Sequence, residues 1–160
     1  VGFGEQDRFE KVNYLARNGV EVHVWGNGWT YKMRAAAHKK LHIHGYAILG
    51  DEYADALCNS AISLCFLRKL NRDFHTSRTF EIPACGGFMM AERTEEHRKY
   101  FIEDKEAVYF SDADELLAKV RYYLNHPEVR AQLAAAGRRR CVDQDYSYHR
   151  LAQDIIRQTN

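Results

Sequence analysis

The fold of this chain is decided by residues 61–91, which are AISLCFLRKLNRDFHTSRTFEIPACGGFMMA. Residues 61–67 form a nearly continuous apolar run, as expected of a strand that is covered on both faces. A polar loop follows, and the pattern then predicts a helix from about Ser77 to Ala84. Gly86-Gly87 ends that helix, and residues 88–91 predict the next strand. Strand, loop, helix and strand in this order indicate a β-α-β unit.

The chain on the N-terminal side of this unit shows the same alternation. Apolar residues at helical spacing follow Asp7 and end at Asn18-Gly19, and residues 20–24 then alternate with the period of a strand. Residues 41–44 predict a short strand, and a helix is expected over about 51–59.

The C-terminal third is predicted to be mainly helical. Residues 107–110 predict a strand, and Ser111 with the acid three residues later resembles a helix start. Pro127 suits the first turn of a new helix with Gly137 as its stop, and a last helix carries Tyr148 and Ile155. Strands that alternate with helices of this length predict an α/β fold. We expect a Rossmann-like parallel sheet with helices on both faces and a helical C-terminal end, in a single domain over 1–160.

Composition excludes several classes of function. The 160 residues are 46% hydrophobic and 28% charged, as in ordinary soluble domains. A formal charge of +1, from 23 basic and 22 acidic side chains, argues against broad attraction to nucleic acid or anionic lipid. No apolar run approaches the roughly 20 residues of a membrane span, so we expect no transmembrane segment and a cytoplasmic location. The cysteines lie among apolar residues without metal-ligand spacing, which predicts buried, reduced thiols: Cys58, Cys65, Cys85 and Cys141.

The start of the chain is unusual. It has no initiator Met and opens on the turn Gly2-Phe3-Gly4 with almost no strand before it. We therefore expect the chain to be part of a longer protein. In an open parallel sheet, ligands bind at the carboxyl ends of strands, where glycines and helix starts suit phosphate. This turn is a candidate phosphate site, with Arg8 as a cation, although a structural turn and a solvated arginine are equally common explanations.

A second candidate is the segment 73–87, which places hydroxyls and an arginine just ahead of a helix. Glu81 follows one turn inside, between apolar neighbours, where a carboxylate is costly unless it is hydrogen-bonded. The two adjacent hydroxyls of a ribose would satisfy it, and the alternative is a cap or a pair with Arg78. A third candidate is Tyr46, after the strand 41–44, which could line a base pocket or serve the core.

Metal and hydrolytic chemistry receive less support. His42 and His44 share one strand face and could bind a metal, but no further ligand is spaced convincingly. Solvated or core histidines are several times more common, so we assign no metal-binding residue. No Ser-His-Asp or Cys-His arrangement stands out.

The segment 78–88, RTFEIPACGGF, closely resembles the hallmark of group 1 glycosyltransferases of the GT-B fold, more narrowly their spore-maturation-protein-like branch. The resemblance continues in order over nearly the whole chain, through residues 24–29, 107–110, 115–117, 122–127, Arg130 and Gly137.

The resemblance implies a domain that binds a nucleoside-diphosphate sugar, for transfer of the sugar to an acceptor hydroxyl. Glu81 matches the second acid of the family pair and would hold the ribose, while Asp73 stands at the first, usually a glutamate. Asp73 and Arg78 are then the catalytic candidates. The remaining binding candidates are diphosphate contacts and one residue near the base: Gly2, Gly4, Arg8, Thr76 and Ser77, and Tyr46.

The resemblance also implies what the donor domain lacks. No cofactor or bound metal is expected, because protein cations would stabilise the leaving diphosphate. The acceptor-binding half should precede Val1, so the isolated chain is expected to be inactive. Two alternatives stay open. One is a non-catalytic nucleotide-binding or protein-interaction module of the same fold. The other is a redox domain that uses a dinucleotide, against which the missing spaced-glycine fingerprint counts.

Overall fold

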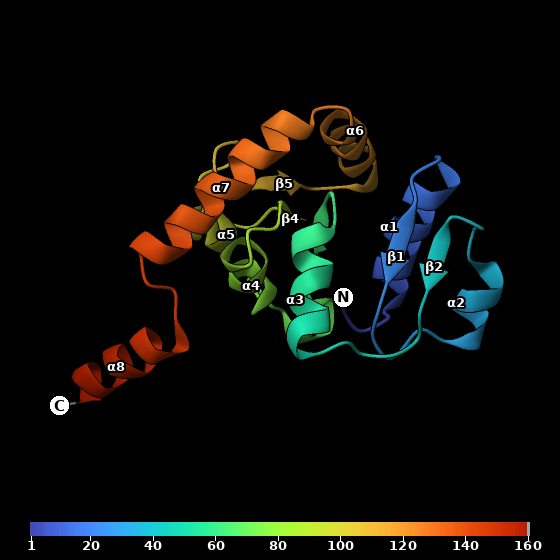
Figure 1. Cartoon of the computed structure of the whole chain (residues 1–160). Coiled ribbons are helices and arrows are strands. Elements are labelled where there is room, and N and C mark those ends of the chain that lie inside the picture. Colours follow the sequence, from blue (N-terminus) through green and yellow to red (C-terminus); the bar gives the residue numbers. More distant parts are fainter. Residues whose placement is uncertain (160) are drawn as a thin grey trace. The chain divides into compact units, whose positions relative to one another are not determined.

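The structure, a computed structural model, describes residues 1–159 (Figure 1). Its strands are β1 (Val22–Val24), β2 (Leu41–Ile43), β3 (Ser63–Cys65), β4 (Met89–Glu92) and β5 (Val108–Phe110). Its helices are α1 (Gln6–Arg17), α2 (Tyr31–Ala36), α3 (Gly50–Asn59), α4 (Arg78–Ala84), α5 (Glu95–Tyr100), α6 (Ala113–Leu124), α7 (Pro127–Asp143) and α8 (Tyr148–Thr159), with a 3-10 turn η1 (Lys69–Asn71). The alternation of strands and helices confirms the predicted α/β class.

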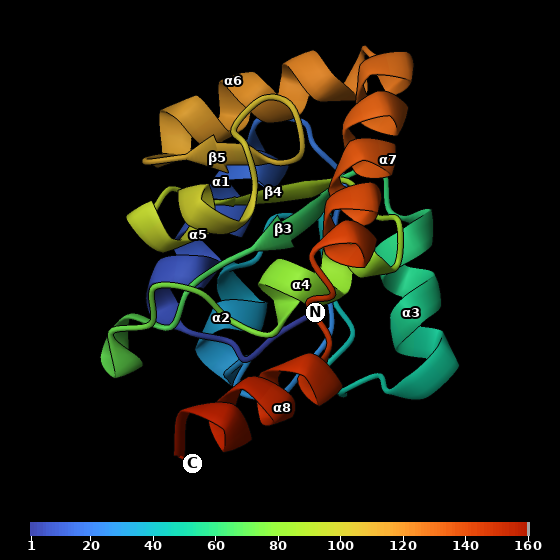
Figure 2. The same cartoon turned by 90° about the vertical axis from the view of Figure 1, so that its left-hand side faces the viewer.

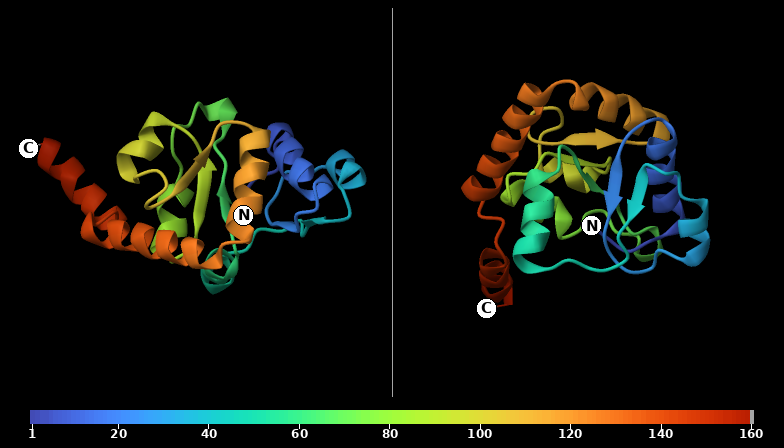
Figure 3. Two further views of the ribbon diagram at one scale, coloured as in Figure 1. Left: turned by 90° about the horizontal axis from the view of Figure 1, so that it is seen from above. Right: turned by 45° about the vertical axis from the view of Figure 1, so that its right-hand side comes forward.

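The strands form two small sheets. β1 and β2 pair in parallel, with Val22 opposite Leu41 and His23 opposite His42, and Figure 3 shows them side by side. The second sheet has the order β3-β4-β5, and β3 pairs with β4 in parallel. Parallel neighbours joined through helices are the pairing that the sequence predicts.

Backbone contacts divide the chain into two compact units, which are described separately. Unit 1 comprises Val1–Ala56 and Phe110–Asn125, and unit 2 comprises Leu57–Tyr109 and the chain from His126 onward. The expectation of one domain over 1–160 stays a prediction.

Unit 1 is built on the amphipathic helix α1, which packs against β1, β2 and α6. The apolar side of α1 is buried, and so are Val22 and Val24 of β1, whereas His23 between them is exposed. This alternation is that of a strand with one covered face and one open face. The open face of the β1–β2 pair therefore carries polar side chains.

Unit 2 has a more deeply buried sheet. Every residue of β5 is buried, as are Met89, Met90 and Ala91 of β4, which explains the continuous apolar runs. Helix α4 packs against α7, β3 and β4, and Figure 2 shows α4 beside α7. The hydroxyl of Tyr109 lies within hydrogen-bonding distance of two carbonyls of the α5 region.

Two predicted helix boundaries were wrong. The N-cap of α6 is Asp112, whose side chain accepts a hydrogen bond from the N–H of Glu115, so the cap lies one residue after Ser111. Ser111 instead donates its backbone N–H to the Glu115 carboxylate at 2.8 Å. The acid that completes this arrangement is therefore Glu115 rather than Asp114.

Gly137 does not end a helix, because α7 continues through it to Asp143. A Cβ at this buried glycine would lie 2.6 Å from the carbonyl oxygen of Glu106. The glycine is there because the helix passes close to another backbone, which is a packing requirement that resembles a stop signal in sequence.

Within the described chain, no helix is both long enough and apolar enough to cross a bilayer.

Candidate functional site

Five of the predicted site residues lie on one short segment of unit 2, 73–81, between η1 and the first turn of α4. Asp73 and Thr76 are half-buried in the loop, and Ser77 is exposed directly before the helix. Arg78 begins α4, and Glu81 lies half-buried in its first turn. The structure thus brings these five residues together. It places them after the carboxyl end of β3, which is where parallel sheets bind ligands.

The chain that leads from β3 into this segment is attached to residues at and after the carboxyl end of β4. The Glu92 carboxylate accepts a hydrogen bond from the N–H of Leu67 at 2.7 Å. The hydroxyl of Thr94, which also caps α5, donates to the carbonyl of Phe74 at 2.8 Å. The loop therefore has two attachments to the neighbouring strand end, although its side chains are largely solvent-accessible.

A buried polar pair holds the start of α4. The Thr79 hydroxyl accepts a hydrogen bond from the N–H of Thr76 at 3.1 Å and lies 2.9 Å from Nε2 of His97. Both Thr79 and His97 are fully buried. Sequence reasoning missed this pair, because His97 lies in the six-residue helix α5, which has too few turns to show a periodicity.

Aromatic rings support the other side of the segment. Phe80 packs edge to face against Tyr100, with ring centroids 4.8 Å apart, and against Tyr146 at 5.2 Å. The ring of His75 contacts Phe80 and Tyr100 in the same manner. These contacts fix the backbone on both sides of Thr76 and Ser77, since edge-to-face pairs constrain ring orientation.

The charged groups of the segment have different surroundings. Nε of Arg78 is buried and has no hydrogen-bond partner within residues 1–159. A buried N–H of a guanidinium that lacks an acceptor is costly, and an anion would satisfy it. Glu81 lies beside the buried Ile82 and Pro83, and its own side chain is half-buried.

The glycine turn Gly2-Phe3-Gly4 of unit 1 is hydrogen-bonded to the backbone that follows β1. The N–H groups of Gly2 and Gly4 donate to the carbonyls of Trp25 and Asn27, both at 2.8 Å. A Cβ on Gly4 would lie 2.6 Å from the backbone nitrogen of Trp29. This turn therefore needs glycine for close backbone packing, and its two glycine amides are already hydrogen-bonded.

Arg8 and Tyr46 are the other predicted site residues in unit 1. Nη1 of Arg8 donates to the carbonyl of Phe3 at 2.5 Å, so the side chain folds back on the glycine turn. Tyr46 is 51% exposed, and its ring meets His44 edge to face at 6.5 Å. The Tyr46 carbonyl accepts the N–H of Gly26 at 2.6 Å, which places the tyrosine beside the end of β1.

The cysteine prediction is corrected in part. All four are free thiols, and Cys65 and Cys141 are buried as expected. Cys58, however, is exposed, and Cys85 is only half-buried. Leu57, the neighbour of Cys58, occupies the buried side of α3, and adjacent helix positions point in different directions.

The sequence profile of the glycosyl transferase-like family matches residues 8–157. No curated protein is similar enough in sequence to count as a relative. Among solved structures, sucrose-phosphate synthase from Thermosynechococcus elongatus superposes with a TM-score of 0.76 at 13% identity, over 98% of this chain and 42% of that one. TarM from S. aureus gives 0.70 at 14% identity, over 96% and 32%.

A third similar structure is the C-terminal domain of the group 1 glycosyl transferase LpcC from Francisella tularensis, with a TM-score of 0.54 at 12% identity over 69% of this chain and 56% of that one. The chain thus spans about half or less of the length of each of these proteins. At such low identity the structures show the fold, and the profile shows the family. The chain belongs to the glycosyl transferase-like family and has the Rossmann-like fold of GT-B glycosyltransferases.

Proposed function

We propose that this chain binds the nucleoside diphosphate of a sugar donor, in an enzyme that transfers the sugar to an acceptor hydroxyl. Its family membership supports a role in glycosyl transfer. The observation that carries the proposal is the segment 73–81, in which Arg78 has a buried Nε without a hydrogen-bond partner on a rigidly held backbone. An acceptor-binding part, a cytoplasmic location and the spore-maturation-protein-like branch belong to the same proposal.

Arg78 is proposed to bind the diphosphate. Breaking the bond between the sugar and the diphosphate leaves negative charge on the departing diphosphate, and a preorganised cation stabilises that charge as it develops. A guanidinium can donate two parallel hydrogen bonds to phosphate oxygens. The hydroxyls of Thr76 and Ser77 would add neutral donors beside it. No cofactor or bound metal is needed for this binding.

The two acids of the segment are assigned different partners. The Glu81 carboxylate would accept hydrogen bonds from both ribose hydroxyls, which a half-buried acid can do while keeping its charge satisfied. Asp73, which is separated from Glu81 by seven residues, is proposed to act near the donor sugar. The side chain of Asp73 is one carbon shorter than that of a glutamate, so the donor sugar would have to lie closer to the backbone for Asp73 to contact it.

The residues of unit 1 are proposed to take part through their shape and charge. Gly2 and Gly4 are proposed to act by shaping the turn beside the phosphates, because their own N–H groups are already hydrogen-bonded to Trp25 and Asn27. Arg8 lies in the first turn of α1 and adds a positive charge there. The exposed ring of Tyr46 offers a face for a nucleobase.

Calorimetric titration with UDP, GDP, ADP and NAD tests the proposal. UDP comes first because the TarM structure contains UDP. We expect one nucleoside diphosphate to bind and Glu81→Gln, which keeps the side-chain shape, to weaken it by more than about tenfold, or about 1.4 kcal/mol. Glu128→Gln, at an exposed acid in the first turn of α7, is the matched control and should bind as the original chain does.

Each other outcome favours a different function. Binding of NAD alone would support the dinucleotide redox domain and overturn the proposal. Equal affinity in a folded Glu81→Gln variant would remove Glu81 from the ribose. Binding of none of the four nucleotides would favour a non-catalytic protein-interaction module of the same fold.

A further inference from the structure

The open face of the β1–β2 pair carries a stack of aromatic side chains. His23 and His42 are opposite each other in the parallel register, and their rings stack with centroids 4.5 Å apart at 19°. On the other side of His23 lies His44, which stacks in turn on Trp25 at 4.4 Å and 8°. Three imidazoles, those of His23, His42 and His44, therefore lie together on one face of two short strands.

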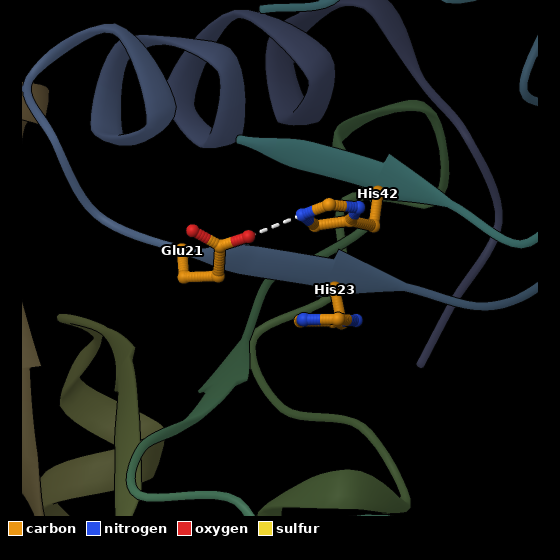
Figure 4. A group of neighbouring side chains, drawn as sticks. All are labelled: Glu21, His23 and His42. Carbon is orange, nitrogen blue, oxygen red and sulfur yellow. Dashed lines mark hydrogen bonds and ion pairs between the residues drawn. The ribbon is translucent and has the colours of Figure 1, made fainter. Parts of the chain in front are cut away.

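A carboxylate completes this group. Glu21 precedes β1, and its Oε1 forms a hydrogen bond with Nε2 of His42 (Figure 4). One ligand atom from each of Glu21, His23 and His42 lies within 4.8 Å of the other two. Figure 4 shows Glu21 and His42 directed toward each other, with His23 beside them on β1. We propose that Glu21, His23 and His42 bind a single divalent transition-metal ion on this face.

The ligand set indicates the kind of ion. Two imidazole nitrogens and one carboxylate oxygen suit Zn²⁺ and its neighbours in the first transition row, whereas Mg²⁺ and Ca²⁺ prefer oxygen ligands alone. Zinc–ligand bonds of about 2.0–2.1 Å put the donor atoms of a tetrahedral site about 3.3 Å apart. Separations up to 4.8 Å would therefore shorten by up to about 1.5 Å on binding, through rotation of the exposed Glu21 and His23 and the half-buried His42.

His44 is placed to orient the imidazole of His23, which is one of the proposed metal-binding side chains. Its Nε2 lies 3.1 Å from Nδ1 of His23. A metal-bound imidazole usually uses its second nitrogen for such a hydrogen bond, which holds the ring in place. We therefore treat His44 as a positioning residue, and the fourth coordination position is left to water.

The alternative is a surface ion pair between Glu21 and His42 on a stack of rings. Exposed ion pairs contribute little to stability, and such a pair would not select a metal. The sequence did not reveal the group, because it depends on the register that sets His42 opposite His23. None of the three proposed ligands belongs to the proposed nucleotide site, although the ring of His44 meets that of Tyr46, the proposed base contact, edge to face at 6.5 Å.

Titration with Co²⁺ and with Zn²⁺, in a non-chelating buffer with a phosphine reductant, tests the site. We expect one equivalent of Co²⁺ to give a visible ligand-field spectrum, and Zn²⁺ to displace it. In competition with a chromophoric chelator, His42→Ala and Glu21→Gln should each lower the affinity for Zn²⁺ by more than about tenfold, because each removes a ligand. His149→Ala, at an exposed histidine of α8, is the matched control and should change nothing.

The contrary results are equally definite. A near-ultraviolet thiolate charge-transfer band on Co²⁺ would assign the ion to a cysteine and overturn the proposal. Equal Zn²⁺ affinity in His23→Ala, His42→Ala and the original chain would do the same. Thermal unfolding provides a second readout, because a bound ion raises the midpoint of the folded chain. Zn²⁺ should raise it in the original chain and in His149→Ala but not in His42→Ala, whose exposed site leaves the fold intact.

Discussion

Oγ1 of Thr79 and Nε2 of His97 lie 2.9 Å apart in the interior of unit 2, and their protonation follows from their neighbours. Nδ1 of His97 lies 2.6 Å from the carbonyl oxygen of Glu92, which can only accept a hydrogen bond. Nδ1 therefore carries the proton, and Nε2 accepts from the threonine hydroxyl. The hydroxyl has its other side satisfied by the N–H of Thr76. A neutral histidine thus fixes the backbone at the start of the proposed diphosphate segment.

Thr79→Val should destabilise the chain although it conserves the shape of the side chain. The change leaves both Nε2 of His97 and the N–H of Thr76 without a partner, and each is an expensive group to bury unsatisfied. We expect a loss of about 1–3 kcal/mol in the free energy of unfolding, measured by urea titration. The reverse swap at an exposed position, Val142→Thr, should stay within about 0.5 kcal/mol of the original chain. An unchanged free energy of unfolding in Thr79→Val would show that the Thr79–His97 pair does not hold α4.

Acid should lower the free energy of unfolding because of His97. Burial holds the pKa of this imidazole below its ordinary value near 6.5. As the pH falls below that value, the unfolded chain takes up a proton here while the folded chain does not. The unfolded state then binds more protons, so the free energy of unfolding falls toward low pH, by at most about 1.4 kcal/mol per pH unit from this residue.

Urea titrations between pH 7.5 and pH 5 measure this dependence. His97→Gln should flatten the fall, because its amide does not titrate, whereas His149→Gln, at an exposed histidine, should leave the fall as it is. Equal slopes in all three chains would mean that His97 does not contribute to the acid sensitivity.

The thiols should react in a fixed order. Cys58 is exposed on α3, whereas Cys65 and Cys141 are buried. Burial raises the pKa of Cys141 to about 11, so its thiolate is scarce at neutral pH as well as inaccessible. With iodoacetamide at neutral pH, mass spectrometry should find label first on Cys58, and on Cys141 only in urea. Early labelling of Cys141 would contradict the buried position of the α7 face that carries it.

A chelator should affect only one of the two proposed sites. Because the proposed contacts to the diphosphate come from protein cations and hydroxyls, EDTA should leave nucleotide affinity unchanged while it removes an ion from Glu21, His23 and His42. Titration calorimetry with and without EDTA measures this. A strict requirement for a divalent ion in nucleotide binding would contradict the metal-free diphosphate site. The metal titrations above would still test the other site independently.

Most of the fold could be predicted from local sequence because its elements have a clear period. The strands β1 to β5 and the helix α1 lie close to the predicted segments. Helices α2 and α5 were not predicted, since six residues give fewer than two turns of periodicity. Short helices are specified more by their caps, Thr30 and Thr94, which each accept a backbone N–H three residues later.

Only the part of the candidate site that is contiguous in sequence could be predicted. Residues 73–81 stand out because their hydroxyls, arginine and acid are adjacent in sequence. Their supports could not be predicted in this way, because Glu92 and His97 are 18 or more residues from the groups they contact. Likewise, His42 and His44 are evident as one strand face, but Glu21 and His23 join them only through the pairing of β1 with β2. Contacts across elements depend on packing, which local spacing does not encode.

Gly137→Ala decides between two explanations of this glycine. If Gly137 were an ordinary helix residue, alanine would stabilise α7 by about 1 kcal/mol through its higher helix propensity. The added Cβ would instead lie 2.6 Å from the carbonyl oxygen of Glu106 and 3.4 Å from Cβ of Pro83. Since a backbone oxygen cannot move aside easily, we expect a net loss of about 1–3 kcal/mol in urea unfolding. Ala135→Gly, at an exposed position of the same helix, should lose about 1 kcal/mol from propensity alone. A stabilised Gly137→Ala would show that α7 does not approach Glu106 so closely.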